Sequence, residues 1–189
     1  IGIDLMADVL KSFIKELSKN DPFQIVAKEI PLVKTLIETG YTGRKGKGGF
    51  YRVNKTGEVK VMEAINLETG EYAVSKKINI KSDKVELKKL ISREDKYGNY
   101  AWSVISKIIK YASSLVPSIT KDFNDIDEAM RLGFNWTKGP FEMLEEIGVE
   151  TFFGKIDDFK GNAFLENLFQ SRNQDFYGSR QKYTDIETF

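Results

Sequence analysis

Residues 99–116 carry two neighbouring apolar stripes at helical spacing, and this pattern does most to limit how the chain can fold. A helix with so wide an apolar face is largely buried between other helices. The segment therefore predicts a mainly α-helical fold. The stripes consist of Trp102, Ile105, Ile109, Ala112 and Val116, and of Val104, Ile108, Tyr111 and Leu115.

Further helices are predicted on both sides of this stretch. Residues 3–18 have amphipathic spacing, and Pro22 and Pro31 suit the first turns of helices over 22–29 and 31–39. Apolar periodicity and glycine or proline boundaries indicate the remaining ones. These cover residues 85–91, 141–147, 149–156 and 161–170.

Capping residues bound one more helix after residue 120. Asn124 or Asp125 is predicted to cap its N-terminus, and Gly133 to end it as a left-handed C-cap. Pro140 then opens the next helix. The residues expected to face the core are Ile126, Ala129 and Met130.

Short β-strands interrupt the helical pattern in the first half of the chain. They are predicted at 50–53, 59–62 and 72–80, with turns at 54–57 and near 69–70. Strands this short form a hairpin or small meander that depends on neighbouring helices for stability. The expected fold is therefore mainly α with a small antiparallel β insert.

Charge balance and missing residue types exclude several classes of function. Among 189 residues, 29 Lys and Arg oppose 28 Asp and Glu, and the net charge of +1 provides no bulk attraction to nucleic acid or to a membrane surface. The sequence has no Cys and no His, which removes thiolate chemistry and the commonest general base and metal ligand. No signal peptide is visible, and Lys107, Lys110 and Pro117 interrupt the most apolar stretch. We expect a cytoplasmic protein without metal.

The basic loop, residues 43–49 with the sequence GRKGKGG, combines four glycines with the cations Arg44, Lys45 and Lys47. Freed backbone amides and positive side chains can hold a phosphate. The loop fits neither GxGxxG nor GxxxxGK[ST], and a strand is predicted after it where those patterns need a helix. Two interpretations stay open: a structural turn, or a non-catalytic module that binds an anionic ligand or RNA. Other basic residues converging on the loop would favour the module.

Six carboxylates and six aromatic residues also allow two interpretations each. The carboxylates could form an acid–base or metal site, but helix first turns favour negative charge, so we interpret them as caps and solvated faces. We interpret the aromatic residues as core, with an acyl pocket as the alternative. The two sets are Asp125, Asp127, Glu128, Glu142, Glu145 and Glu146, and Trp102, Phe134, Trp136, Phe141, Phe152 and Phe153.

Residues 125–142 resemble a signature of the C-terminal helical domain of 3-hydroxyacyl-CoA dehydrogenases. They read DIDEAMRLGFNWTKGPFE, and the family pattern is D-I-D-x-A-M-x-x-G-x-x-x-x-x-G-P-F-E. Gly148 and the basic loop also match, although residues 46–48 stand where family loops often have T-G-K. The motif positions are Gly133, Gly139, Pro140, Phe141 and Glu142.

The resemblance implies a bundle-like helical fold in two copies. Residues 1–53 correspond to the rear of the first copy, 54–95 to a β-containing insert with a linker helix, and 96–189 to the second copy. A weak internal repeat agrees with this arrangement. It pairs IGID at 1–4 with IGVE at 147–150, and GFY at 49–51 with DFY at 175–177.

The family oxidises L-3-hydroxyacyl-CoA with NAD in fatty-acid β-oxidation, using a Rossmann domain, a His–Glu pair and an assisting Asn. Because the chain has no His and no GxGxxG, the resemblance implies that catalytic and cofactor-binding residues lie upstream and that this chain alone is inactive. Its role would be to cover the substrate cleft and supply domain and dimer contacts. Arg44, Lys45 and Lys47 are candidates to touch the CoA phosphates. An enoyl-CoA hydratase domain is expected in some such proteins, and the apolar surface of residues 3–17 predicts self-association.

Overall fold

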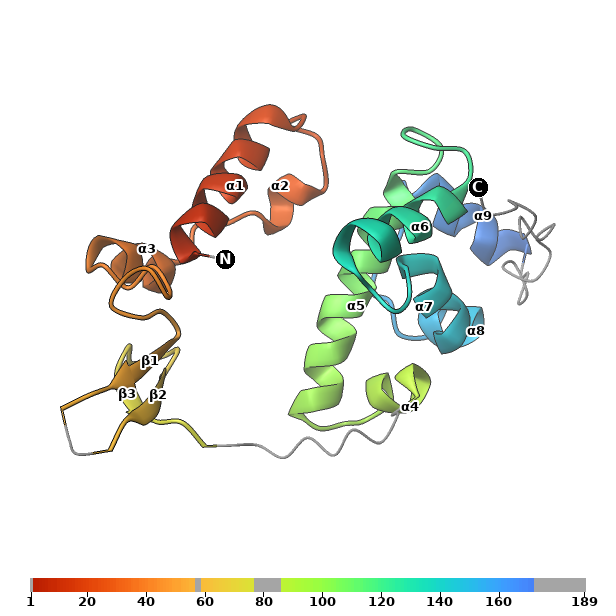
Figure 1. Ribbon diagram of the computed structural model, residues 1–189. Coiled ribbons are helices and arrows are strands. Elements are labelled where there is room, and N and C mark those ends of the chain that lie inside the picture. Colours follow the sequence, from red (N-terminus) through yellow and green to blue (C-terminus); the bar gives the residue numbers. More distant parts are fainter. Residues whose placement is uncertain (1, 57–58, 77–85, 172–189) are drawn as a thin grey trace, which may run out of the picture. The chain divides into compact units, whose positions relative to one another are not determined.

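The structure is a computed structural model that describes residues 2–56, 59–76 and 86–171 (Figure 1). It divides into two compact units, unit 1 with residues 1–81 and unit 2 with residues 82–189. Helices predominate, and the strands of unit 1 form one small antiparallel sheet, so the predicted fold class is confirmed. The three-part division at residues 53 and 95 stays a prediction.

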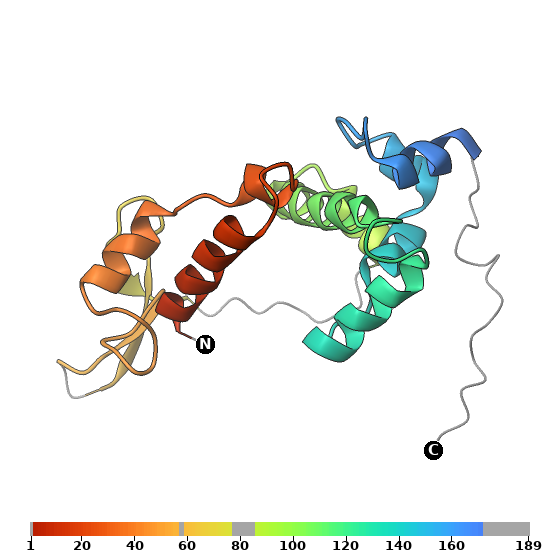
Figure 2. The same cartoon turned by 90° about the horizontal axis from the view of Figure 1, so that it is seen from above.

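Unit 1 places three helices before its sheet. Proline at the first turn begins α3 as predicted, and α2 packs on the C-terminal part of α1 through the rings of Phe13 and Phe23, 5.6 Å apart. Helix α3 lies beside the first turns of α1 (Figures 1 and 2). The elements are α1 (Ile3–Glu16), α2 (Phe23–Val26), α3 (Pro31–Glu38), β1 (Tyr51–Asn54), β2 (Val61–Ile65) and β3 (Tyr72–Val74).

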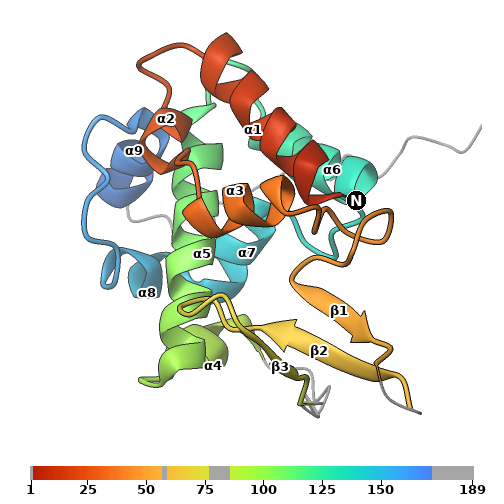
Figure 3. The same cartoon turned by 90° about the vertical axis from the view of Figure 1, so that its left-hand side faces the viewer.

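The sheet has the order β1-β2-β3, with both pairs antiparallel (Figure 3). Tyr51 pairs with Ala64, and Ala64 pairs in turn with Ala73 on β3. The second strand runs over 61–65 instead of 59–62, and the third ends at Val74 among the described residues. The predicted continuation over 77–80 lies outside them.

The core of unit 1 is small and leaves one face of α1 uncovered. Ile3, Val33 and Leu36 are buried, and half-buried side chains such as Phe50 and Ile65 complete the cluster. Apolar side chains of α1 are between 37% and 55% exposed, which is unusual for an amphipathic helix in a closed core. They are Leu5, Met6, Val9, Phe13 and Ile14.

Unit 2 is a helical cluster around α5 (Figure 3). Its buried core joins side chains from α4, α5, α7, α8 and α9, with Phe141 and Phe152 as the largest. The elements are α4 (Leu87–Ile91), α5 (Lys96–Ser114), α6 (Phe123–Phe134), α7 (Pro140–Ile147), α8 (Val149–Phe153) and α9 (Ala163–Ser171).

Helix α5 is less covered than its two stripes predict. Ile109 and Ala112 of the first stripe are buried, whereas Val104 of the second stripe is exposed and Ile108 is half-buried. Helices α4, α7 and α9 pack on α5, and its Trp102 ring also contacts Phe152 of α8. The second stripe is therefore only partly covered within the described part of unit 2.

The predicted boundaries of α6 are wrong at both ends. Asp122, not Asn124 or Asp125, caps the N-terminus and accepts a hydrogen bond from the Asn124 amide at 2.9 Å. The helix continues through Gly133 to Phe134 and ends at Asn135, whose φ of 55° is left-handed. Asparagine tolerates this conformation because its short polar side chain bonds locally.

Two more predictions about α6 are corrected by the side-chain burial. Ala129 is exposed and Met130 is half-buried outside the core cluster, whereas Ile126 packs against the core as predicted. Phe134, predicted in the core, is 70% exposed because it occupies the last turn, beyond the part of α6 that contacts α7.

Candidate functional site

The joint between α6 and α7 contains the most specific polar geometry of unit 2. Asp127 is 1% exposed, and its two carboxylate oxygens accept hydrogen bonds from the amides of Phe141 at 2.8 Å and Glu142 at 3.0 Å. These amides belong to the first turn of α7, where no intrahelical acceptor exists. Asp127 thus acts as a cap, but it caps a neighbouring helix and lies buried instead of on a solvated face.

Gly139 makes this cap possible because it sits at the N-cap position of α7 and has no side chain. A Cβ atom there would lie closer than 3.0 Å to the Cα, Cγ and Oδ1 atoms of Asp127. The Glu142 carboxylate accepts from the Gly139 amide at 2.8 Å and also pairs with Arg131 on α6. Asp127 and Glu142 together accept hydrogen bonds from the first backbone amides of α7 and connect this helix to α6.

Phe141 anchors the same joint from its apolar side. The ring is fully buried, with centroids of Phe123 on α6 and Phe164 on α9 both 5.1 Å away. Pro140, also buried, supplies the fixed φ that suits the first helical position. Four motif positions, 139–142, therefore act as one structural unit that joins three helices.

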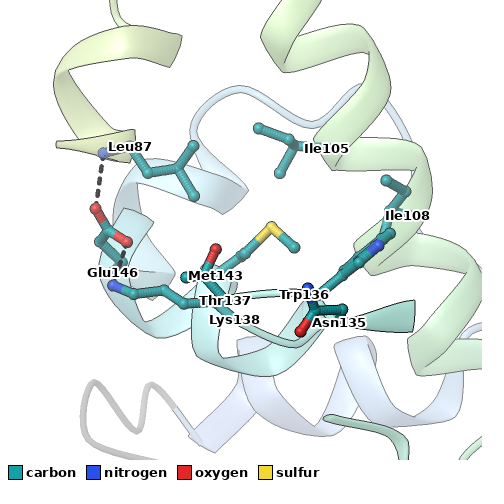
Figure 4. A pocket seen from close by; sticks show the side chains of 9 residues that line it. All are labelled: Leu87, Ile105, Ile108, Asn135, Trp136, Thr137, Lys138, Met143 and Glu146. Carbon is teal, nitrogen blue, oxygen red and sulfur yellow. Dashed lines mark hydrogen bonds and ion pairs between the residues drawn. The ribbon is translucent and has the colours of Figure 1, made fainter. Parts of the chain in front are cut away.

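A cavity of about 490 Å³ opens beside this joint (Figure 4). Its apolar wall includes side chains of α5 and α7: Ile108 of α5 lies next to Trp136, and the side chain of Met143 extends from α7 toward α5. Trp136, predicted in the core or in an acyl pocket, is half-buried at this wall. The lining residues are Leu87, Ile105, Ile108, Asn135, Trp136, Thr137, Lys138, Met143 and Glu146.

Glu146 closes the rim of this cavity by linking three segments. Its carboxylate accepts from the Leu87 amide at 2.7 Å, at the start of α4, and from the Lys138 ammonium at 2.6 Å. Partial burial opposes ionisation, but the hydrogen bonds from Lys138 and Leu87 outweigh it and hold the pKa of Glu146 below its usual value. Glu146 stays ionised as a structural link at neutral pH.

Most residues that line this cavity are not predicted from the sequence. The second stripe of α5, which includes Ile108, was the signal that could have indicated an open apolar wall. Leu87 and Glu146 carry no such signal, because they meet only through the packing of α4 on α7. The cavity of unit 2 holds none of the predicted cations.

Arg44, Lys45 and Lys47 lie in unit 1, where the basic loop borders a second cavity of about 1260 Å³. The loop is a tight hairpin in which the Gly43 amide donates to the Gly48 carbonyl at 2.6 Å. The Lys47 ammonium donates to the Thr39 carbonyl at the end of α3, at 3.0 Å. Arg44 and Lys45 are exposed at its tip.

A polar network on the sheet holds the base of this loop. Arg52 donates from Nε to Glu63 at 2.6 Å and from Nη1 to the Tyr41 hydroxyl at 3.1 Å, and its guanidinium lies 4.0 Å from the centroid of the Tyr72 ring. The Tyr72 hydroxyl donates to the Gly49 carbonyl at 2.6 Å. Strand β3 is thereby connected to the end of the basic loop.

Glu63→Gln is expected to weaken unit 1 at neutral pH and to remove part of its acid sensitivity. Hydrogen bonds from Asn54 and then Arg52 lower the pKa of Glu63. A lowered folded-state pKa stabilises the fold above the unfolded value of about 4.3 and loses that stabilisation as pH falls. Amide exchange over 49–54 and 61–65 of the full chain, at about pH 7 and about pH 3, measures the difference. Equal protection of variant and wild type at both pH values would contradict the prediction.

Metal ligation and membrane insertion have no structural support in the described ranges. No three Asp or Glu side chains among residues 2–56, 59–76 and 86–171 gather into a group that could hold a metal ion. None of the helices described there is both long and apolar enough to span a bilayer.

The chain resembles known proteins through a family match inside unit 2 and through longer matches to individual relatives. Residues 98–175 match the family model described as 3-hydroxyacyl-CoA dehydrogenase, C-terminal domain. Putative fatty acid oxidation complex trifunctional enzymes of Rickettsia felis and Rickettsia prowazekii are 35% and 36% identical over 144 residues, which are 76% of this chain and 20% of each relative.

A probable 3-hydroxyacyl-CoA dehydrogenase of Bacillus subtilis is 27% identical over 187 residues, which cover 94% of this chain and 23% of that protein. The chain therefore spans about a fifth of the length of these curated relatives. No solved structure matches it. The resemblance seen in the sequence is confirmed by these matches.

Proposed function

Because this chain, through residues 98–175, belongs to the family of 3-hydroxyacyl-CoA dehydrogenase C-terminal domains, we propose that it is the C-terminal region of a longer NAD-dependent dehydrogenase. The parent protein oxidises L-3-hydroxyacyl-CoA to 3-oxoacyl-CoA in fatty-acid β-oxidation, in the cytoplasm. It carries a Rossmann domain before these residues and, as the trifunctional name of the Rickettsia relatives suggests, an enoyl-CoA hydratase domain as well.

Within that enzyme we assign this chain a structural role. The observation that carries the proposal is the family match over α5 to α9, whose signature residues 139–142 form the joint around Phe141. A rigid helical unit of this kind can cover a substrate cleft. The exposed apolar face of α1 supports a further role in domain or dimer contacts, because such faces usually find a partner.

The residues of this chain do not fit NAD. A dinucleotide pyrophosphate is held by a glycine-rich turn that leads from a strand into a helix. The basic loop instead follows α3 and leads into β1. The sequence also has no His to serve as the family's general base. These observations support the proposal that nucleotide binding and proton transfer belong to the rest of the parent protein.

The isolated chain is expected to show no NAD binding in a calorimetric titration and no oxidation of 3-hydroxyacyl-CoA. It lacks a cradle for the pyrophosphate and a candidate base. A dissociation constant in the range of about 1–10 μM, about −7 to −8 kcal/mol of binding free energy, would contradict this.

The parent protein is the positive control for this titration. It should bind NAD and form NADH when 3-hydroxyacyl-CoA is added. A parent that folds and binds acyl-CoA but does not reduce NAD would overturn the proposed function.

The second candidate function, a non-catalytic module for an anionic ligand or RNA, rests on the basic loop alone. The net charge of +1 does not favour RNA. An anionic group of small size agrees better with the loop.

A further inference from the structure

We propose that the basic loop is a binding site for a phosphate group, which Arg44 and Lys45 contact while Lys47 positions the loop. The inference needs only the geometry of unit 1 and holds whether or not the parent protein is a dehydrogenase. The three cations of the loop, which look equivalent in the sequence, then have two roles: contact with the phosphate and positioning of the loop.

The cavity beside the loop is lined by charged side chains that are mainly positive. Five basic side chains and a single carboxylate, that of Asp4, line it. A concave surface lined by one sign of charge concentrates ions of the opposite sign. The basic lining consists of Arg44, Lys45, Lys47, Arg52 and Lys55. Outside the loop, Arg52 and Lys55 add to this lining, and Arg52 is paired with Glu63, so Lys55 is the further cation that supports a binding module over a plain turn.

Arg44 and Lys45 are the cations at the loop tip that remain available. Neither side chain forms a hydrogen bond or ion pair with any residue that the structure describes, and both are exposed. Arg52 is occupied by Glu63 and stacks on Tyr72. An arginine and a neighbouring lysine suit a phosphate, since the guanidinium binds two oxygens at once and the ammonium adds a point charge.

Lys47 has a different task because its ammonium already has a partner. It donates to the Thr39 carbonyl at 3.0 Å and lies 6.0 Å from the centroid of the Tyr41 ring. Its amide donates to the Gly40 carbonyl, also at 3.0 Å. Lys47 thus fastens the returning arm of the hairpin to the end of α3.

Backbone contacts hold the loop in this shape before any ligand arrives. A Cβ at Gly46 would lie 2.5 Å from the Gly40 carbonyl oxygen, so the two arms are as close as glycine allows. The amides of Arg44 and Lys45 donate to no described acceptor. These two successive N–H groups adjoin the two available cations, and in the proposed site they supply further donors for an oxyanion.

The test is a calorimetric titration of the full chain at low salt with inorganic pyrophosphate and, separately, with adenosine 3′,5′-bisphosphate. Wild type should show saturable binding of at least one probe. R44Q/K45Q should weaken it about tenfold or more, by loss of two charge-assisted contacts. The control K11Q/K34Q removes equal charge from exposed positions outside the cavity and should bind like wild type.

The probes also identify the source of the phosphate. Tighter binding of the bisphosphate indicates a nucleotide head such as that of CoA, and equal binding indicates a free phosphate. Lys47→Gln should weaken binding and also increase amide exchange over 43–49, whereas R44Q/K45Q should leave that exchange unchanged.

Three results would overturn the proposal. One is the absence of saturable binding of either probe by the folded wild type. Another is equal weakening by the R44Q/K45Q and K11Q/K34Q variants, which would indicate general charge attraction. The third is binding of a short single-stranded RNA without binding of either small phosphate, which would assign the loop to nucleic acid.

Discussion

Phe141→Ala is expected to lower the free energy of unfolding of unit 2 by about 3 kcal/mol. The ring is fully buried and lies between Phe123 and Phe164, so its loss leaves a cavity at the point where α6, α7 and α9 meet. Urea denaturation followed by tryptophan fluorescence measures the effect. Both tryptophans of the chain, Trp102 and Trp136, belong to unit 2.

Phe134→Ala is the matched control because it removes the same side chain from the neighbouring helix. Phe134 is 70% exposed, so its loss should cost less than about 0.5 kcal/mol. A loss below about 1 kcal/mol for Phe141→Ala, or equal losses for both variants, would show that Phe141 does not anchor the core. It would also make a ligand or partner role for that ring the better interpretation.

Local patterns in the sequence predict the elements of this fold well. The periodicity of 3–18 and the prolines at 31 and 140 mark helices whose formation depends on nearby residues, and α1, α3 and α7 begin close to the expected positions. Phe141, Leu144 and Ile147 recur at helical spacing, which indicates the inward side of α7. These features need no knowledge of tertiary contacts.

Contacts between helices explain what the sequence could not predict. The sequence places Asp127 in the first turn of a helix, where a carboxylate caps its own helix or faces water, but Asp127 lies one turn further along α6 and caps α7. Phe134 and Gly133 share the periodicity of α6, yet both are exposed because α7 contacts an earlier part of that helix. Periodicity identifies the apolar side of a helix and leaves open how far a neighbour covers it.

Each candidate site also combines a feature that the sequence predicts with one that depends on tertiary contacts. The glycine and lysine content of the basic loop marks it in the sequence as a turn with positive charge. The different roles of Arg44 and Lys47 depend on the hydrogen bond from the Lys47 ammonium to the Thr39 carbonyl. This bond forms only because the loop packs on the end of α3. The cavity beside Trp136 likewise depends on α4, whose Leu87 is 49 positions earlier in the sequence.

Gly139→Ala is expected to destabilise unit 2 by about 3 kcal/mol, although alanine suits the extended backbone at this position. The added Cβ would overlap the Cα and the carboxylate of Asp127, and one of those atoms is backbone that cannot rotate away. Helices α6 and α7 must therefore separate. Their separation breaks the hydrogen bonds that the Phe141 and Glu142 amides donate to Asp127. Such hydrogen bonds are worth about 1.5–3 kcal/mol each when the acceptor is charged.

Gly133→Ala separates this steric effect from the general effect of replacing glycine by alanine. Gly133 lies inside α6, and a Cβ there would meet no atom within 4 Å. The substitution should stabilise unit 2 by about 0.5–1 kcal/mol, because alanine loses less conformational entropy in a helix. Opposite signs of the two changes in the urea midpoint are the expected result. If Gly139→Ala left the stability of unit 2 unchanged, Asp127 could move away from residue 139 without loss of stability. The joint would then not be the rigid unit that the proposed function requires.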